Sequence, residues 1–106
     1  MARVSYAQIS SIGLISGGTA TTTTAIALAE NAGTATRIGV WVCNTGGTNA
    51  LLVRFRSDVS ADITATTATF TLAAGAREYV PAGVAVGIDV EAAASTTTYT
   101  ITEVIG

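Results

Sequence analysis

The stretch VWVCNTGGTNALLVRF, Val40–Phe55, places two apolar runs on either side of a glycine-containing loop, Asn44–Asn49. A loop of this composition has two readings: it could cradle a phosphate with its backbone amides, or it could only turn the chain between two strands. A phosphate-binding P-loop needs a lysine and a following helix. The chain contains no lysine, and the run after the loop alternates as a strand does. The sequence therefore favours a turn, and we predict a hairpin in which Gly46 and Gly47 take positive φ.

Both runs alternate with a period of two, so each predicts a strand with one buried face and one outward face. On the first strand the predicted inward side chains are Ile38, Val40 and Val42, and the outward ones are Arg37, Trp41 and Cys43. On the second strand the inward set is Leu51, Val53 and Phe55, and the outward set is Leu52, Arg54 and Arg56. The two runs are expected to pair as the arms of the hairpin.

Alternation continues along the rest of the chain. A strand within Thr21–Ala29 is expected to direct Ile26 and Leu28 inward, and Val84–Glu91 is the clearest half-buried strand. Further strands are expected around Ala68–Leu72, Arg77–Val80 and Thr97–Ile105, with turns at Ala73–Gly75, Pro81–Gly83 and Ala92–Ser95. The segment Leu28–Gly33 is expected to be a loop.

About seven or eight short strands with closely spaced turns indicate an all-β fold, a single antiparallel β-sandwich of the jelly-roll or immunoglobulin-like kind. The length of 106 residues fits one domain. Residues 1–18 alternate poorly and end in Ser16-Gly17-Gly18. We therefore expect an N-terminal arm or an extra strand at residues 1–18, and the sandwich body at residues 19–106.

The composition points to contact with other protein chains. Hydrophobic residues make up 49% of the chain and charged residues only 11%, whereas soluble domains carry about 25% charge. A surface with few ions is cheap to dehydrate, as protein–protein contact requires. The net charge is −2 and the arginines form no basic run, so we expect no nucleic-acid partner. No apolar run reaches the roughly 18 residues of a membrane span, so we expect no membrane partner.

The residue types needed for most catalytic sites are missing. The chain has no histidine and no lysine, which excludes Ser-His-Asp and Cys-His systems, histidine-ligated metals and Schiff bases. The lone Cys43 cannot form an intrachain disulfide; it is expected to be a small packed residue, although a disulfide between chains stays open. We expect no enzyme, no metal site and no cofactor.

Two carboxylate pairs remain, Asp58 with Asp62 and Asp89 with Glu91. Such pairs could act as acid and base in glycoside hydrolysis or bind Ca²⁺. Neither pair has the spacing of a known ligand motif. We interpret the first as turn carboxylates and the second as a solvated strand face.

Three outward residues of the central strands are candidate contacts. Trp41 could be an interface anchor or, as an alternative, a platform on which a sugar stacks; we favour burial, in the domain or in an interface. Arg54 and Arg56 could pair with carboxylates across a subunit boundary, or could form an exposed, solubilising strand face.

Three segments of the sequence resemble segments of small structural proteins of tailed bacteriophages: VWVCNTGGTNALLVRF (40–55), FTLAAGAREYVPAG (70–83) and TTYTITEVI (97–105). These proteins are β-sandwiches with a strand, an Asn-Thr-Gly loop, a second strand, a Leu-Ala-Ala-Gly turn and a closing hairpin rich in valine and threonine. The similarity covers about residues 38–105 and lies in the order of strands, loops and turns instead of in a diagnostic motif. The composition, rich in Ala, Thr and Gly and free of lysine, is also similar.

The resemblance implies a capsid decoration, or cement, protein that binds the major capsid protein in many copies and stabilises the outer shell of the virion. It also implies a homotrimer, made in the host cytoplasm, with an N-terminal arm that touches the shell or a neighbouring subunit. The candidate contacts in that arm are Arg3, Val4, Tyr6 and Ile9. The alternative function is a carbohydrate-binding or adhesin-like module of a phage tail or fibre. Deleting residues 2–18 is expected to weaken capsid attachment more than folding.

Overall fold

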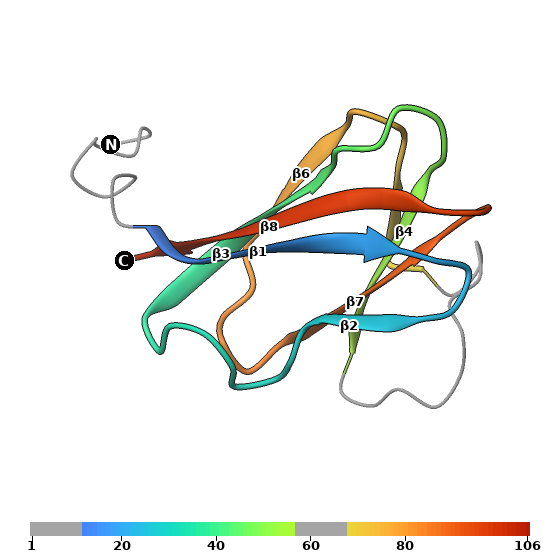
Figure 1. The fold of residues 1–106 in the computed structure, drawn as a ribbon. Coiled ribbons are helices and arrows are strands. Elements are labelled where there is room, and N and C mark those ends of the chain that lie inside the picture. The colour runs from blue at the N-terminus through green and yellow to red at the C-terminus, as the bar shows by residue number, and fades with distance from the viewer. Residues whose placement is uncertain (1–11, 57–67) are drawn as a thin grey trace.

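The computed structural model describes residues 12–56 and 68–106, which form eight β-strands and no helix (Figure 1). The strands are β1 (Ile12–Ala20), β2 (Ala25–Leu28), β3 (Arg37–Asn44), β4 (Leu51–Arg56), β5 (Phe70–Leu72), β6 (Arg77–Val80), β7 (Gly87–Ala92) and β8 (Thr97–Ile105). The turns expected at Ala73–Gly75, Pro81–Gly83 and Ala92–Ser95 lie between strands, and Leu28–Gly33 continues from the end of β2 into a loop.

The strands form two four-stranded antiparallel sheets, in the orders β1-β8-β3-β6 and β2-β7-β4-β5. The pairing is nested, because β1 pairs with β8, β2 with β7, β3 with β6 and β4 with β5. One long hairpin wound over itself gives this order, which is the jelly roll and not the immunoglobulin arrangement. The predicted all-β sandwich is confirmed.

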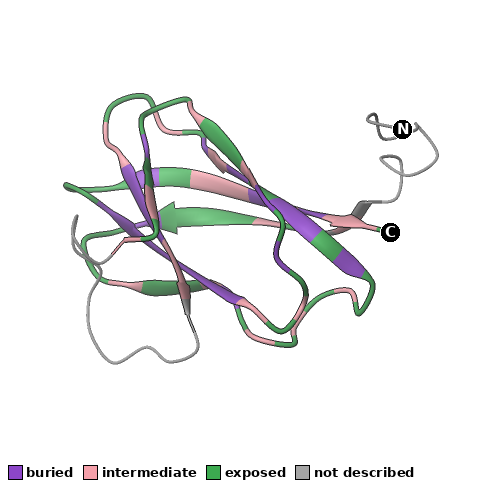
Figure 2. Cartoon of the chain, turned by 180° about the vertical axis from the view of Figure 1, so that it is seen from behind, coloured by how far each residue is buried: buried purple, intermediate pink, exposed green. Residues whose placement is uncertain are grey.

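The core lies between the two sheets and is built from small aliphatic side chains. Figure 2 marks the buried residues in purple along the strands. Fully buried members include Val40 and Val42 from one sheet and Leu51, Val53 and Ile88 from the other. Each such side chain contributes about 1.5–3 kcal/mol relative to leaving it exposed. The period-two alternation therefore identified the inward face of β4 and most of that of β3.

The predicted hairpin between β3 and β4 is wrong, because these strands belong to different sheets. Asn44 is the last residue of β3, and its buried side chain holds the loop that leads from β3 to β4. Its Nδ2 donates to the carbonyl oxygens of Asn49, at 2.9 Å, and of Leu72, at 3.0 Å. Its Oδ1 accepts from the Thr97 hydroxyl at 2.7 Å and from the Gly46 amide at 3.1 Å. The amide group thus fixes a crossing from one sheet to the other, with every side-chain bond satisfied inside the protein.

Glycine serves a different purpose in this loop than the sequence suggested. Among the described residues, positive φ occurs at Asn31, Gly33, Gly75 and Ser95, and not at Gly46 or Gly47. A Cβ at Gly46 would overlap the Thr97 hydroxyl. Gly46 is therefore explained by close approach, and the expectation of positive φ at both loop glycines is corrected.

Shifts of register in β2 and β3 reverse the predicted directions of some of their side chains. The β3–β8 pairing shifts between Arg37 and Gly39, so Arg37 turns inward at 4% exposure while Ile38 is 49% exposed. The β2–β7 pairing shifts between Ile26 and Leu28, which leaves Ile26 54% exposed. A bulge adds one residue to one strand and so moves the side chains beyond it to the other face.

Two predicted boundaries also differ. β7 begins at Gly87, so Val84 and Val86 precede it, and all six of its residues are buried instead of half of them. Residues 12–18 belong to β1, which pairs with β8, so residues 12–20 supply an extra strand of the sandwich. Residues 1–11 lie outside the described part of the chain.

Candidate protein-binding face

The outer face of the β1-β8-β3-β6 sheet carries a row of large side chains. Trp41 in β3 lies opposite Thr102 of β8 and Tyr79 of β6, and Thr102 in turn lies opposite Ile15 of β1. Cross-strand partners share a face of a sheet, so these four side chains run across all four strands. Ile15 is 62% exposed and Trp41 is 39% exposed.

A second row lies beside the first. Cys43 of β3 faces Thr100 of β8 and Arg77 of β6. We call the outward side chains of both rows the Trp41 face: Ile15, Trp41, Cys43, Arg77, Tyr79, Thr100 and Thr102. Arg77 carries the only charge in this set, so most of the face can lose its water at little cost.

Trp41 is held by two neighbours. Its ring centroid is 5.3 Å from that of Tyr79, with the planes tilted by 58°. The Arg77 guanidinium lies over the indole, 5.4 Å from its centroid, which is cation–π geometry. Trp, Tyr and Arg are the residue types that contribute most to protein–protein binding. The site thus groups three such residues on the outer face of one sheet.

Two of the charged residues are sequestered in the interior. The Arg37 guanidinium lies 3.6 Å from Glu103 Oε2, and neither side chain is exposed. Arg37 also donates to the carbonyl oxygens of Ala82, Gly83 and Val86. Burial lowers the pKa of Arg37, and the charge of Glu103 acts in the opposite direction.

Glu103 receives its own bonds from the loop before β3. Thr34 donates its amide to both carboxylate oxygens, at 3.1 and 3.2 Å, and its hydroxyl to Oε1 at 2.9 Å. Gly33, at φ 95°, allows this approach, since a Cβ there would meet the carboxylate. The cluster joins β3, β8 and the loops on either side, and sequence reasoning missed it because alternation placed Arg37 outward.

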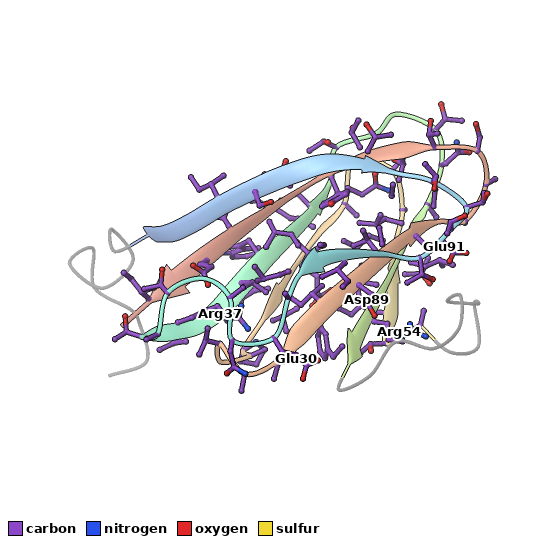
Figure 3. All side chains as sticks on the ribbon, turned by 60° about the horizontal axis from the view of Figure 1, so that its bottom comes forward. Glu30, Arg37, Arg54, Asp89 and Glu91 are labelled. Atoms are coloured by element: carbon purple, nitrogen blue, oxygen red, sulfur yellow. The ribbon has the colours of Figure 1, made fainter. Side chains whose placement is uncertain are left out.

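The outer face of the second sheet carries buried carboxylates (Figure 3). Asp89 is 0% exposed and its Oδ2 lies 3.3 Å from Arg54 Nη2. Glu91 is 7% exposed and accepts a bond of 2.7 Å from the Thr24 hydroxyl. The interpretation of Asp89 and Glu91 as a solvated strand face is therefore wrong. Alternation placed them on the correct face but could not show that neighbouring side chains cover it.

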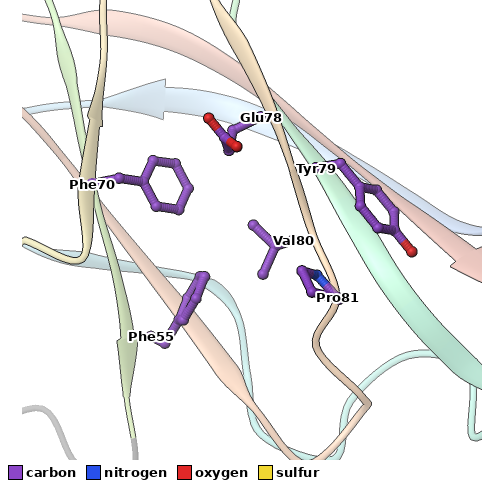
Figure 4. Close-up of a pocket in the computed structure, with 6 residues that line it drawn as sticks. All are labelled: Phe55, Phe70, Glu78, Tyr79, Val80 and Pro81. Atoms are coloured by element: carbon purple, nitrogen blue, oxygen red, sulfur yellow. The ribbon is translucent and has the colours of Figure 1, made fainter.

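A shallow groove opens on the β5–β6 side of the sandwich (Figure 4). Its volume is about 300 Å³, and its lining residues are Phe55, Phe70, Glu78, Tyr79, Val80 and Pro81. Phe55 and Phe70 meet edge to face with their ring centroids 5.8 Å apart. The groove is small and open, and one exposed carboxylate, Glu78, lies at its rim.

The remaining sequence candidates are only partly located. Arg3, Val4, Tyr6 and Ile9 lie outside the described residues, as do Asp58 and Asp62. Arg56 ends β4 and lies opposite Gly87 of β7. The Arg54 side chain is 16% exposed and bridges to Asp89 of its own chain, so the structure provides an internal carboxylate for it.

Within residues 12–56 and 68–106, no cluster of three or more His, Cys, Asp or Glu side chains is placed to hold a metal ion. In the same part of the chain, the structure contains no helix with the length and hydropathy of a bilayer span.

No known protein family matches the sequence, and no curated protein is similar to it. Solved structures are similar in fold. A chain from Bacillus endospore appendages, described as forming a novel family of disulfide-linked pili, has a TM-score of 0.51 and 21% identity. The alignment covers 91% of this chain and 90% of that one. The chain therefore shares its β-sandwich fold with a pilus protein, which is a structural protein.

Two other structures are more distant. The protein TT1209 from Thermus thermophilus has a TM-score of 0.49 and 14% identity, over 89% of this chain and 73% of that one. A sugar phosphate isomerase of the cupin superfamily from Silicibacter pomeroyi has a TM-score of 0.41 and 14% identity, over 89% of this chain but only 47% of the isomerase.

Proposed function

We propose that the protein is a structural virion protein that decorates a bacteriophage capsid and stabilises it by binding the major capsid protein in many copies. The observation that carries the proposal is the Trp41 face, where Trp41, Tyr79 and Arg77 form one exposed cluster. The choice of the major capsid protein as the partner rests on the three sequence segments that resemble bacteriophage proteins. No catalytic group enters this function, so we propose that the protein is not an enzyme.

The distribution of charge supports a binding role. Arg37, Asp89, Glu91 and Glu103 are buried, and the described exposed charges include the neighbours Arg77 and Glu78 on β6. Desolvating a charge is a main cost of association. Burial of these four charged side chains reduces that cost, and many weak contacts then add up through avidity.

The Bacillus chain of similar fold belongs to pili, which are assemblies of many protein subunits. That likeness supports only the coarser part of the proposal, a structural role. Attachment to a capsid and the virion location are proposals from the resemblance of the sequence, and the homotrimer stays a prediction of that resemblance alone.

The test is co-sedimentation of the purified protein with undecorated phage capsids. Trp41→Ala is expected to reduce the affinity by about 10-fold or more, since truncation of an interface anchor costs about 2 kcal/mol. Ile26→Ala is the matched control, because Ile26 is an exposed apolar residue on the other sheet. Binding that is equally strong in both variants would remove the Trp41 face from the proposal, and absence of wild-type binding would refute capsid attachment.

The carbohydrate-binding alternative uses the same Trp41. Sugars stack on the face of an aromatic ring, but the Arg77 guanidinium already covers one face of this indole. A glycan array decides between the two functions: a signal that disappears in Trp41→Ala would favour the carbohydrate module.

A further inference from the structure

Among the strands of residues 12–56 and 68–106, β1 forms one edge of its sheet, because it pairs with β8 on one side only. At such an edge, alternate N–H and C=O groups point away from the sheet and offer a template for another strand. β1 is nine residues long, whereas β6 at the opposite edge has four residues and is followed by Pro81. β1 is therefore the longer of the two edges; its register with β8 shifts between Ile12 and Ile15 and is regular from Ile15 to Ala20.

This edge also lacks charge. The sequence from Val4 to Ala29 contains no charged residue, which includes β1, β2 and the connection between them. By contrast, β6 carries the exposed Arg77 and Glu78. Edge strands are usually protected by charges, proline, shortness or bulges; β1 has only the register shift between Ile12 and Ile15, and its Ile15–Ala20 part has none of these devices. Since each copy carries a net charge of −2, an edge without charged side chains avoids direct contact between like charges when two copies meet there.

We propose that two copies of the chain pair through β1, antiparallel and across a two-fold axis, so that the two β1-β8-β3-β6 sheets join into one. The partner of the β1 edge is thus a second copy of this chain. The inference goes beyond the proposed function, which concerns the shell, and it does not depend on it.

The side chains of β1 suit this pairing. Ile15, Gly17 and Thr19 alternate along the strand on the side of the Trp41 face. When the strand pairs with itself about Ser16, Ile15 lies opposite Gly17 of the second copy. The missing side chain of that glycine leaves room for the exposed Ile15. The row through Trp41, Thr102 and Ile15 then continues from one copy into the other.

The area involved sets the strength of the contact. A nine-residue strand is about 30 Å long and a sheet is about 10 Å thick, so the pairing covers roughly 600 Å² in total. Stable complexes bury about 1,200–2,000 Å². We therefore expect a weak dimer that forms with rising concentration. A two-fold contact uses the same surface on both copies, so it differs from the homotrimer that the sequence resemblance implies.

The test is sedimentation equilibrium of the full-length chain up to about 1 mM, the weak end of measurable association. The average mass is expected to rise from 10.6 kDa toward twice that value. Ile15→Lys and Thr19→Lys are each expected to weaken the dimer at least 10-fold, because lysine protects edge strands. The matched control is Ile38→Lys, which adds the same charge at an exposed isoleucine on the interior strand β3 and is expected to leave the dimer unchanged.

Several results would overturn the pairing: a monomer at every concentration, a discrete trimer, or equal weakening by Ile15→Lys and Ile38→Lys. Capsid co-sedimentation separates this failure from failure of the proposed function. A monomer that binds capsids refutes only the β1 pairing, whereas a dimer that binds no capsid refutes only the decoration role.

Discussion

Replacing Glu103 by glutamine tests whether the buried Arg37 cluster stabilises the sandwich. The change keeps the size of the side chain but removes the charge that faces the Arg37 guanidinium at 3.6 Å, where both side chains are fully buried. Removing one partner of a buried ion pair costs about 3–5 kcal/mol, because the other charge stays buried. Arg37 retains three carbonyl acceptors, so we expect the lower end, about 3 kcal/mol.

The assay is urea unfolding followed by the fluorescence of Trp41, with the free energy of unfolding obtained by linear extrapolation. A loss of about 3 kcal/mol corresponds to a Tm lower by roughly 12–24 °C for a domain of this size. Glu78→Gln is the control, since Glu78 is an exposed carboxylate, and it should change the stability by less than about 0.5 kcal/mol.

Arg37→Met and the double variant complete a thermodynamic cycle. Arg37→Met leaves the Glu103 carboxylate with only the two donors of Thr34 among the bonds described above, so a loss of about 3–5 kcal/mol is expected. The double variant should lose less than the sum of the two single variants, by about 1–3 kcal/mol, because contacting residues are coupled. Additive losses, or a loss below about 1 kcal/mol in Glu103→Gln, would refute the reasoning.

Three further predictions follow from single residues. Gly46→Ala should lower the free energy of unfolding by about 1–3 kcal/mol, because its Cβ would collide with Thr97, whereas Gly47→Ala, with nothing within 4 Å, serves as a neutral control in the same urea assay. Burial raises the pKa of Tyr99 above its usual value of 10.0. The neutral phenol therefore stabilises the fold below pH 10, and this stabilisation is lost as the pH rises through the pKa of the folded state. The decrease in the free energy of unfolding at alkaline pH should be smaller in Tyr99→Phe. Cys43→Ser should weaken capsid co-sedimentation far less than Trp41→Ala, because it replaces the thiol of a partly exposed member of the Trp41 face by a hydroxyl of similar size; loss of binding, or binding abolished by a reductant, would instead indicate a disulfide between chains.

The sequence predicted strands better than it predicted their partners. Alternation located the strand β8 and, on β4, the buried Leu51 and Val53, because side-chain direction in a strand is a local property. It could not show that β3 and β4 lie in different sheets. That outcome depends on Asn44, whose amide bonds reach Leu72 and Thr97, far away in the sequence.

The candidate site was predicted in part, for a similar reason. Trp41 was expected outward and is the centre of the exposed face, but its neighbours Tyr79 and Arg77 come from β6 and could be grouped with it only through the β3–β6 register. The outward prediction for Arg37 failed because a register shift between Arg37 and Gly39 cannot be read from a regular pattern. Burial of Asp89 likewise depends on an ion pair with another strand.

The nested pairing of the strands has a consequence for how the protein is made. β8 is an interior strand, held between β1 and β3, yet it follows the other seven described strands in the sequence. During synthesis the first sheet therefore cannot close until the segment through Ile105 has left the ribosome. Contacts this far apart in sequence slow folding and leave apolar faces uncovered in the meantime. Chains cut before β8 should consequently aggregate or engage chaperones, and the emergence of β8 from the ribosome should limit how fast the folded sandwich accumulates.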